Sequence, residues 1–142
     1  MAEIKLAGTE IGCIAAFQNM TKATPRDCII EEDNAITFIV NKEDMGYAIG
    51  KNGANIRHSS SVLKKEVNVV EYSPDPVKFI KNVMYPIRPK NINIEGKNSK
   101  TVAKISVEKK DRSLAIGSRG RNIHRLKKIV MRHHDIDDVV IV

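Results

Sequence analysis

Two short segments with paired glycines are the residues of this sequence whose type and spacing best fit a chemical task. Residues 50–53 (GKNG) and 117–120 (GSRG) each hold two glycines three positions apart, around polar or basic residues. Because glycine has no Cβ atom, its backbone can approach a sugar-phosphate chain closely. A helix that begins at such a loop also directs unpaired N–H groups towards the same place. The two segments therefore predict contact with phosphate groups.

Both segments lie inside a longer internal repeat. Residues 44–57 (DMGYAIGKNGANIR) align with residues 111–124 (DRSLAIGSRGRNIH), and 7 of the 14 positions are identical. The copies are offset by 67 positions, nearly half of the 142-residue chain. Two copies of one unit of about 70 residues are the simplest explanation.

Two alternatives explain less of the pattern. A helix–turn–helix connection would use one glycine as a left-handed cap and the other to relieve crowding. It accounts for the glycines but not for the basic residues at and after the second segment. A Walker-type loop requires GxxxxGK[ST]. Met45 stands where its first glycine would be and Asn52 where its hydroxyl would be, so nucleotide hydrolysis is not predicted.

The charge is distributed unevenly between the two copies. Residues 1–74 carry eight Lys and Arg against ten Asp and Glu, a balance of −2. Residues 75–142 carry 16 against 7, a balance of +9, which together give the net charge of +7. A basic half beside a weakly acidic half favours a polyanionic partner, engaged mainly by the C-terminal half.

Basic side chains follow the second glycine segment closely. They are Arg119, Arg121, Arg125, Lys128 and Arg132, and the last three are spaced to lie along one side of a helix. Alone they would fit an ordinary solvated helix face, but their position directly after a phosphate-type loop favours binding. The first copy offers a thinner set, Lys51, Arg57, Lys64 and Lys65.

Aromatic residues are too few for a base-stacking platform, with no Trp, three Tyr and three Phe. Phe17 and Phe38 also fit apolar faces better than a surface. An aliphatic floor for bases is possible instead, from Ile49, Ile56, Ile116 and Ile123, although each of these also fits a core.

Catalytic and metal-binding patterns are missing from the sequence. His58, His124, His133 and His134 have no metal-ligand spacing, and His133-His134-Asp135 fits a helix end. Cys13 and Cys28 form no CxxC pair and are expected to be reduced, packed thiols. No apolar run approaches the roughly 20 residues that span a bilayer, and the N-terminus is unlike a signal peptide. We expect a cytoplasmic protein that is not an enzyme and has no cofactor, metal or membrane contact.

Each copy shows the same order of elements, α-β-β-α-(GxxG)-α-β. In the first we expect a helix over 2–19, strands over 28–30 and 35–40 around a turn at 31–34, a short helix over 42–49, a helix to about 65 and a strand over 67–72. In the second we expect a helix from about 77, strands over 87–94 and 102–107 around a turn at 95–100, helical residues 114–116, a helix after 120 and a strand over 139–142. The intervening Ser73-Pro74-Asp75-Pro76 is the predicted boundary, with Asp75 as a helix cap.

The repeated AIGxxGxNI motif, with a helix first and one strand last in each copy, resembles type II KH domains. The likeness extends over nearly the whole chain through four further sequence segments: RDCI at 26–29, DMG at 44–46, VVEYS at 69–73 and RHHDIDDV at 132–139. As a set they are similar to the short archaeal NusA-like transcription termination factors, which are tandem KH proteins. Ser118 stands where that family's loop usually has a lysine, and Arg119 and Arg121 are placed to supply the charge.

The resemblance implies an α/β (α+β) fold of two tandem type II KH domains, residues 1–74 and 75–142. Each would be α-β-β-α-α-β, with a three-stranded mixed sheet and helices on one face. It also implies binding of single-stranded RNA, since a KH loop clamps about four nucleotides. The role would be transcription elongation or termination, with RNA polymerase or other transcription factors as further partners. RNA processing, ribosome assembly, or a protein-interaction scaffold without RNA affinity remain as alternatives.

Bacterial relatives carry a polymerase-binding domain and an S1 domain before their KH pair, and we expect neither within 142 residues. The candidate RNA-contacting residues are Ile49, Gly50, Lys51, Asn52, Gly53, Arg57, Lys64, Ile116, Gly117, Ser118, Arg119, Gly120, Arg121, Arg125 and Lys128.

Overall fold

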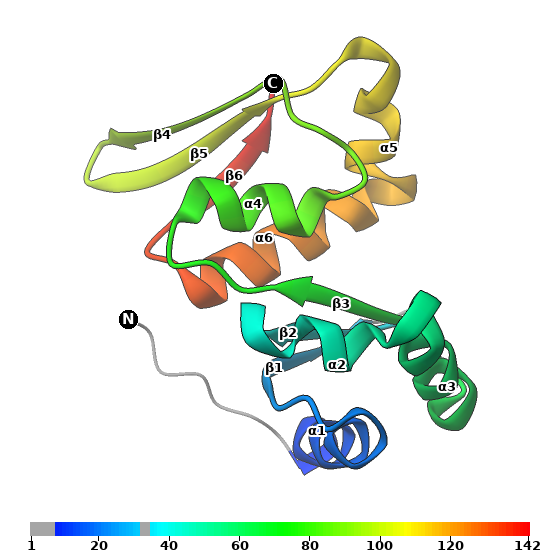
Figure 1. Cartoon of the computed structure of the whole chain (residues 1–142). Helices are drawn as coiled ribbons and strands as arrows, with labels where there is room; N and C mark the ends of the chain where they lie inside the picture. The colour runs from blue at the N-terminus through cyan, green and yellow to red at the C-terminus, as the bar shows by residue number, and fades with distance from the viewer. Residues whose placement is uncertain (1–7, 32–34) are drawn as a thin grey trace. The chain divides into compact units, whose positions relative to one another are not determined.

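The computed structural model describes residues 8–31 and 35–142, and the chain forms two compact units that divide between Ser73 and Pro74 (Figure 1). We call the described residues up to Ser73 the first unit and those from Pro74 the second unit. Both contain a helix, a β-hairpin, two helices around a glycine loop, and a final strand. Among the described residues, no helix is long and apolar enough to cross a membrane.

The first unit places its helices on a small mixed sheet. Strand β2 (Ile36–Val40) lies in the centre, antiparallel to β1 (Pro25–Ile30) and parallel to β3 (Val67–Glu71). The elements are α1 (Gly8–Thr21), β1 (Pro25–Ile30), β2 (Ile36–Val40), the 3-10 turn η1 (Lys42–Asp44), α2 (Met45–Ile49), η2 (Lys51–Gly53), α3 (Ala54–Leu63) and β3 (Val67–Glu71).

Aromatic and aliphatic side chains fill the space between the helices and this sheet. Phe17 of α1 stacks on Phe38 of β2 with ring centroids 4.1 Å apart, and neither ring is exposed. Cys28 and Val67 join the same cluster from the neighbouring strands. The interpretation of Phe17 and Phe38 as core residues is thus confirmed.

The second unit repeats the arrangement with β5 (Lys100–Ser106) in the centre, antiparallel to β4 (Asn91–Lys97) and parallel to β6 (Asp138–Ile141). Asp75 caps the first helix by accepting a hydrogen bond from the Val77 N–H at 3.0 Å, as the sequence predicts. The elements are α4 (Pro76–Met84), β4 (Asn91–Lys97), β5 (Lys100–Ser106), η3 (Lys109–Asp111), α5 (Arg112–Ile116), η4 (Ser118–Gly120), α6 (Arg121–His133) and β6 (Asp138–Ile141).

Helices α4 and α6 meet over this second core. Phe79 of α4 and Ile129 of α6 are fully buried, as is Ile105 of the central strand. His133 is also buried, with its ring 5.5 Å from that of Phe79, measured between centroids. Apolar residues at helical spacing on α4 and α6 therefore fix the helix layer that carries the second glycine loop.

The structure corrects the expected second hairpin. Residues 87–90 are not a strand, and β4 begins only at Asn91. The turn is shorter than predicted, because Asn98 and Ser99 alone make it, with φ of 52° and 65°. A two-residue turn with both φ positive matches the twist of the flanking strands, so the strands extend to its edges.

Other boundaries shift by a few residues. In the described chain α1 starts at Gly8 and ends at Thr21, two residues later than expected. Just beyond this end, the Thr21 hydroxyl accepts a hydrogen bond from the Ala23 N–H at 3.1 Å. Residues 2–7 of the predicted helix and 32–34 of the predicted turn lie outside the described residues.

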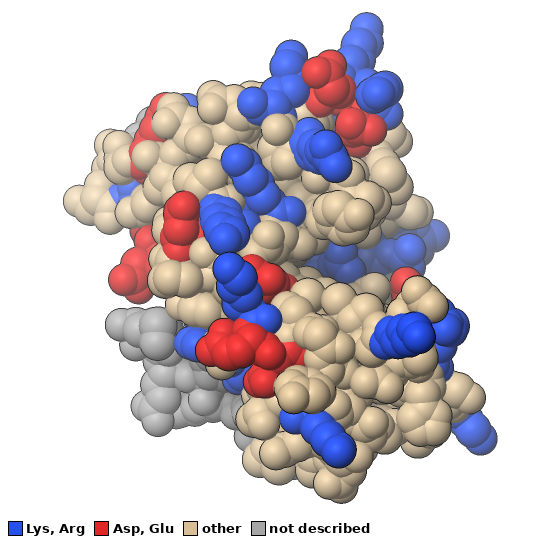
Figure 2. All heavy atoms as spheres, in the orientation of Figure 1, with Lys and Arg blue, Asp and Glu red and all other residues tan. Residues whose placement is uncertain are grey.

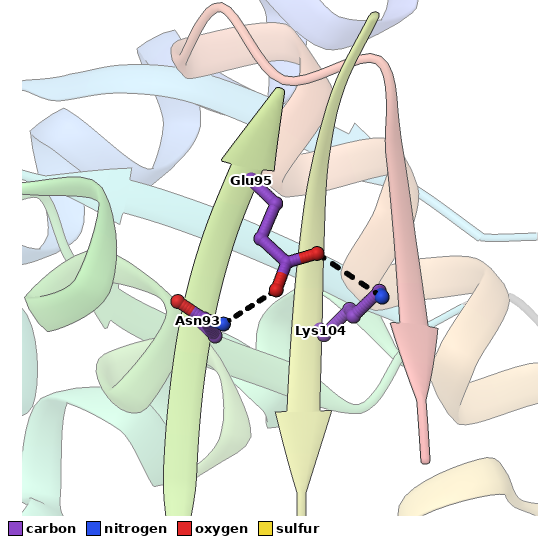
Figure 3. A network of polar contacts seen from close by, with 3 residues as sticks. All are labelled: Asn93, Glu95 and Lys104. Atoms are coloured by element: carbon purple, nitrogen blue, oxygen red, sulfur yellow. Dashed lines mark hydrogen bonds and ion pairs between the residues drawn. The ribbon is translucent and has the colours of Figure 1, made fainter. Parts of the chain in front are cut away.

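The face of the second sheet that points away from its helices carries polar residues (Figure 3). Glu95 of β4 pairs with Lys104 of β5 at 3.1 Å and accepts from the Asn93 side chain at 2.6 Å. Successive side chains of a strand point to opposite faces of the sheet. Ile92, Ile94 and the buried side chains in the centre of β5 therefore lie on the other face, towards the helices.

Candidate nucleic-acid interface

The two glycine loops have nearly the same backbone although the residues between the glycines differ. Gly50 has φ 76° and ψ 172°, and Gly117 has φ 81° and ψ 168°. This region is accessible almost only to glycine. The third residue is left-handed in both loops, with φ 56° and ψ 30° at Asn52 and φ 57° and ψ 27° at Arg119. One backbone shape is therefore built twice.

An asparagine side chain fastens each loop. The Asn55 amide donates to the Tyr47 carbonyl at 2.6 Å, and the Asn122 amide donates to the Leu114 carbonyl at 2.7 Å. A Cβ atom on Gly50 would lie 2.7 Å from the Asn55 Cγ, so the glycine and the asparagine fit together as a pair.

The two asparagines were not among the candidate residues. The sequence did offer one signal for Asn55 and Asn122. The same residue type stands at this position in both copies of the repeat, two residues after the second glycine of each loop. The two asparagine side chains bond to the backbone before each loop, and a spacing pattern does not show that role.

Each loop leaves backbone amides available. The Gly50 N–H donates to the Gly46 carbonyl at 2.9 Å and the Gly53 N–H to the Gly50 carbonyl at 3.2 Å. The corresponding bonds of the second loop, from Gly117 and Gly120, are 2.8 and 3.1 Å. These bonds use the amides of the glycines and not those of the two residues between them. The latter stand at the start of a helical segment, where N–H groups have no partner within the helix.

The basic side chains of the first loop have separate positions. Lys51 is exposed between the glycines, and Arg57 donates to the carbonyl oxygen of Asn52. Arg57 therefore supports the loop from within its own unit. Lys64 is the C-cap of α3, with φ 56°. It lies about 15 Å along the helix from the loop, so the structure does not bring it to the glycines.

The basic side chains of the second loop are more concentrated. Ser118, Arg119 and Arg121 are exposed at the loop and the start of α6, and Lys128 is exposed two turns further on. Arg125 is half-buried between them, and its Nε has no hydrogen-bond partner in the described part of the chain.

The predicted aliphatic floor is only partly available. Ile49 and Ile116, which precede the loops, are half-buried, as are Ile56 and Ile123 after them. They stand at the border of each core, where part of each side chain packs inside and part remains exposed.

Basic and acidic side chains are mixed over the visible surface of the second unit (Figure 2). Residues 75–142 hold 16 Lys and Arg against 7 Asp and Glu. Lys127 pairs with Asp138 at 3.1 Å. Hydrogen bonds from the Lys127 side chain and the Val139 N–H lower the pKa of the Asp138 carboxyl. Lys127 thus joins α6 to β6, whereas Arg119 and Lys128 have no such pairing among the described residues.

Within the described part of the chain, no group of three or more His, Cys, Asp or Glu side chains could hold a metal ion.

Comparisons with known proteins agree with this geometry. Residues 76–139 match the family model of the NusA-like second KH domain, and residues 14–88 match a KH domain model. The probable transcription termination protein NusA of Methanocaldococcus jannaschii is 33% identical over 142 residues, covering 100% of this chain and 77% of that protein. The protein of the same name from Halobacterium salinarum is 34% identical over 136 residues, covering 96% of both.

The chain belongs to the NusA family of archaeal transcription termination proteins. The crystal structure of APE1850 superposes with a TM-score of 0.81 at 30% identity, covering 96% of this chain and 100% of that one. The predicted fold class, two KH domains with three-stranded mixed sheets, is confirmed. As a NusA-like KH protein the chain is a non-catalytic factor of the transcription machinery.

Proposed function

We propose that this NusA-like protein binds single-stranded RNA through its two glycine loops, one in each KH domain, and acts in transcription elongation or termination. The domains are taken as residues 1–74 and 75–142. The observation that carries the proposal is the shared loop backbone, which depends on Gly50 and Gly117 at angles that few other residues adopt. A loop that only connected two helices would not need the same unusual path twice.

Exposed chemistry at the loops supports the same proposal. Lys51 in the first loop and Arg119 in the second are exposed beside backbone amides at a helix start. Amides and cations together suit a phosphodiester, and a KH loop holds about four nucleotides in this way.

The proposal is tested by placing carboxylates in the second loop. Replacing Ser118 and Arg119 by Asp should weaken binding of a labelled single-stranded RNA by tenfold or more, measured by fluorescence anisotropy at several salt concentrations. Aspartate tolerates a left-handed backbone, so folding should be kept, which circular dichroism checks.

The matched control is Ser99→Asp with Lys100→Asp, in the turn between β4 and β5. It changes the charge by the same amount, also at a residue with positive φ and an exposed lysine. We expect a small loss from it, through long-range attraction alone. Equal losses from both double variants would reject the loop as a contact. An intact chain that binds no RNA at low salt would favour a protein-interaction scaffold.

A further inference from the structure

A cavity of about 260 Å³ opens on the helical side of the second unit. One wall is the end of α4 with the turn after it, from Val83 to Ile87, and the other is made by α5 and α6. All of the residues that line it belong to helices or to that turn, so it is separate from any groove between helices and sheet. Two of them, Tyr85 and Leu114, are 72% and 59% exposed and stand at its rim.

The cavity adjoins the second glycine loop. Leu114 precedes Gly117 by three residues and Asn122 follows Gly120 by two, and both line the cavity. The hydrogen bond between their amide and carbonyl groups, at 2.7 Å, fastens the loop and also joins the two halves of this wall. A strand of RNA held at the loop would lie close to the cavity.

Two polar residues line this largely apolar space. The Arg125 side chain makes no hydrogen bond or ion pair with the described residues, and its Nε is a buried donor without an acceptor among them. Buried donors of this kind are rare in folded proteins. The bond that Asn122 makes to Leu114 uses its amide nitrogen, which leaves its carbonyl oxygen as an acceptor. No carboxylate lines the cavity. Its chemistry is thus an apolar slot with a cationic donor and a neutral acceptor.

We propose that this cavity takes one unstacked base of the bound RNA, with guanine preferred, and that Arg125 reads its edge. The inference rests on the proposed function and adds a base-reading site beside the phosphate-binding loop. Guanine presents two acceptors, O6 and N7, to an arginine. RNA-binding proteins hold splayed bases against side chains and bond their edges. Ligand pockets usually begin near 300 Å³, so 260 Å³ suits one base.

An apolar side chain from a protein partner would also fit the volume. It would leave both the Arg125 donor and the Asn122 acceptor without a partner, because a hydrocarbon offers neither group. It would also give no reason for the cavity to lie next to the loop. The base is therefore the occupant that the geometry favours.

The test uses the full chain and a set of oligouridine 10-mers that carry one guanosine, adenosine or cytidine at each position in turn. We expect guanosine to improve affinity about tenfold at one position. Arg125→Gln should abolish that preference. Arg125→Lys should keep the salt slope, since the charge remains, but lose the preference, since an ammonium cannot present the planar fork of arginine.

Lys128→Gln is the matched control for Arg125→Gln. It removes one positive charge from the same helix, outside the cavity. We expect it to weaken all of the oligomers by the same factor and to leave the guanosine preference intact. Methyl NMR signals of Leu114 and Val83 report directly on occupancy, and they should shift with the preferred oligomer and much less with plain oligouridine.

The outcomes separate this inference from the proposed function. If RNA binds with a clear salt dependence but Arg125→Gln and Lys128→Gln behave alike, the cavity is not a base site and the proposed function stands. The inference also fails if the preferred oligomer leaves the Leu114 and Val83 methyl signals unmoved. If no oligomer binds at low salt, both fail.

Discussion

The two glycine loops share a backbone but differ in what surrounds them. The first is GKNG, supported by an arginine that donates to a carbonyl of its own loop. The second is GSRG, followed by a helix on which Arg121 and Lys128 are exposed. Both are fastened by the same asparagine-to-carbonyl bond. Loop shape and loop charge are therefore set by different residues. A few contacts that both loops share fix the path of the backbone, and the exposed side chains around it differ between the loops.

The largest expected effect is a difference in stability between replacing the first glycine of a loop and replacing the second. Gly117→Ala should lower the free energy of unfolding by about 3 kcal/mol, because its backbone suits only glycine. Its Cβ would also lie 2.8 Å from the Asn122 backbone nitrogen. Gly120→Ala should cost about 1 kcal/mol, since φ is 73° and the nearest atom to its Cβ is 3.7 Å away. Urea unfolding followed by circular dichroism measures both, and equal costs would contradict this account.

The charge difference between the loops is tested by two triple variants. We expect Arg121, Arg125 and Lys128 to Ala to weaken RNA binding more than Lys51, Arg57 and Lys64 to Ala. Each lost phosphate contact should reduce the salt slope by about 0.7 on a single strand. Arg57 supports its loop and Lys64 lies at the far end of α3, so the first triple removes fewer contacts. Anisotropy on one RNA at several salt concentrations decides, and a larger loss from the first triple would reverse the comparison.

The shared asparagine predicts an equal effect in both units. Asn55→Ala and Asn122→Ala should each cost about 1 kcal/mol, the usual net value of a hydrogen bond, because each removes one bond to a backbone carbonyl. Each should also weaken RNA binding, since its loop loses part of its ordered shape. Asn41→Ala is a control outside the loops, where the side chain accepts from Arg26 at 3.1 Å. A loss confined to one unit would mean that the loops are held differently.

The last comparison concerns the two thiols, which both lie in the first unit, and its effect on stability near neutral pH is the smallest of the set. Burial, together with the nearby Cys13, raises the pKa of the Cys28 thiol from 9.0 to about 12. The native state therefore favours the neutral thiol. That stabilisation is complete below about pH 9 and is lost as the pH rises towards 12. At pH 8 iodoacetamide should alkylate Cys28 about 1000-fold more slowly in the folded chain than in urea, followed by mass spectrometry.

The sequence by itself determined the repeat, the order of the elements and the position of both loops. The glycines and the AIGxxGxNI motif made this possible, because they act locally and at fixed spacing. The second hairpin was predicted less well. Apolar Ile87 looked like part of a strand, yet it lies in the loop after α4, and only pairing with β5 decides that β4 begins at Asn91.

Only the tertiary structure decided what the basic side chains do. Arg57 turns back to the Asn52 carbonyl, and Arg125 lies half-buried on a cavity wall formed with the end of α4. Lys64 ends its helix far from the glycines. All three belong to the same class of residue at plausible spacing, so composition could not separate them. The reason is physical: a long side chain takes its direction from the groups packed around it, and those come from segments that are distant in the sequence.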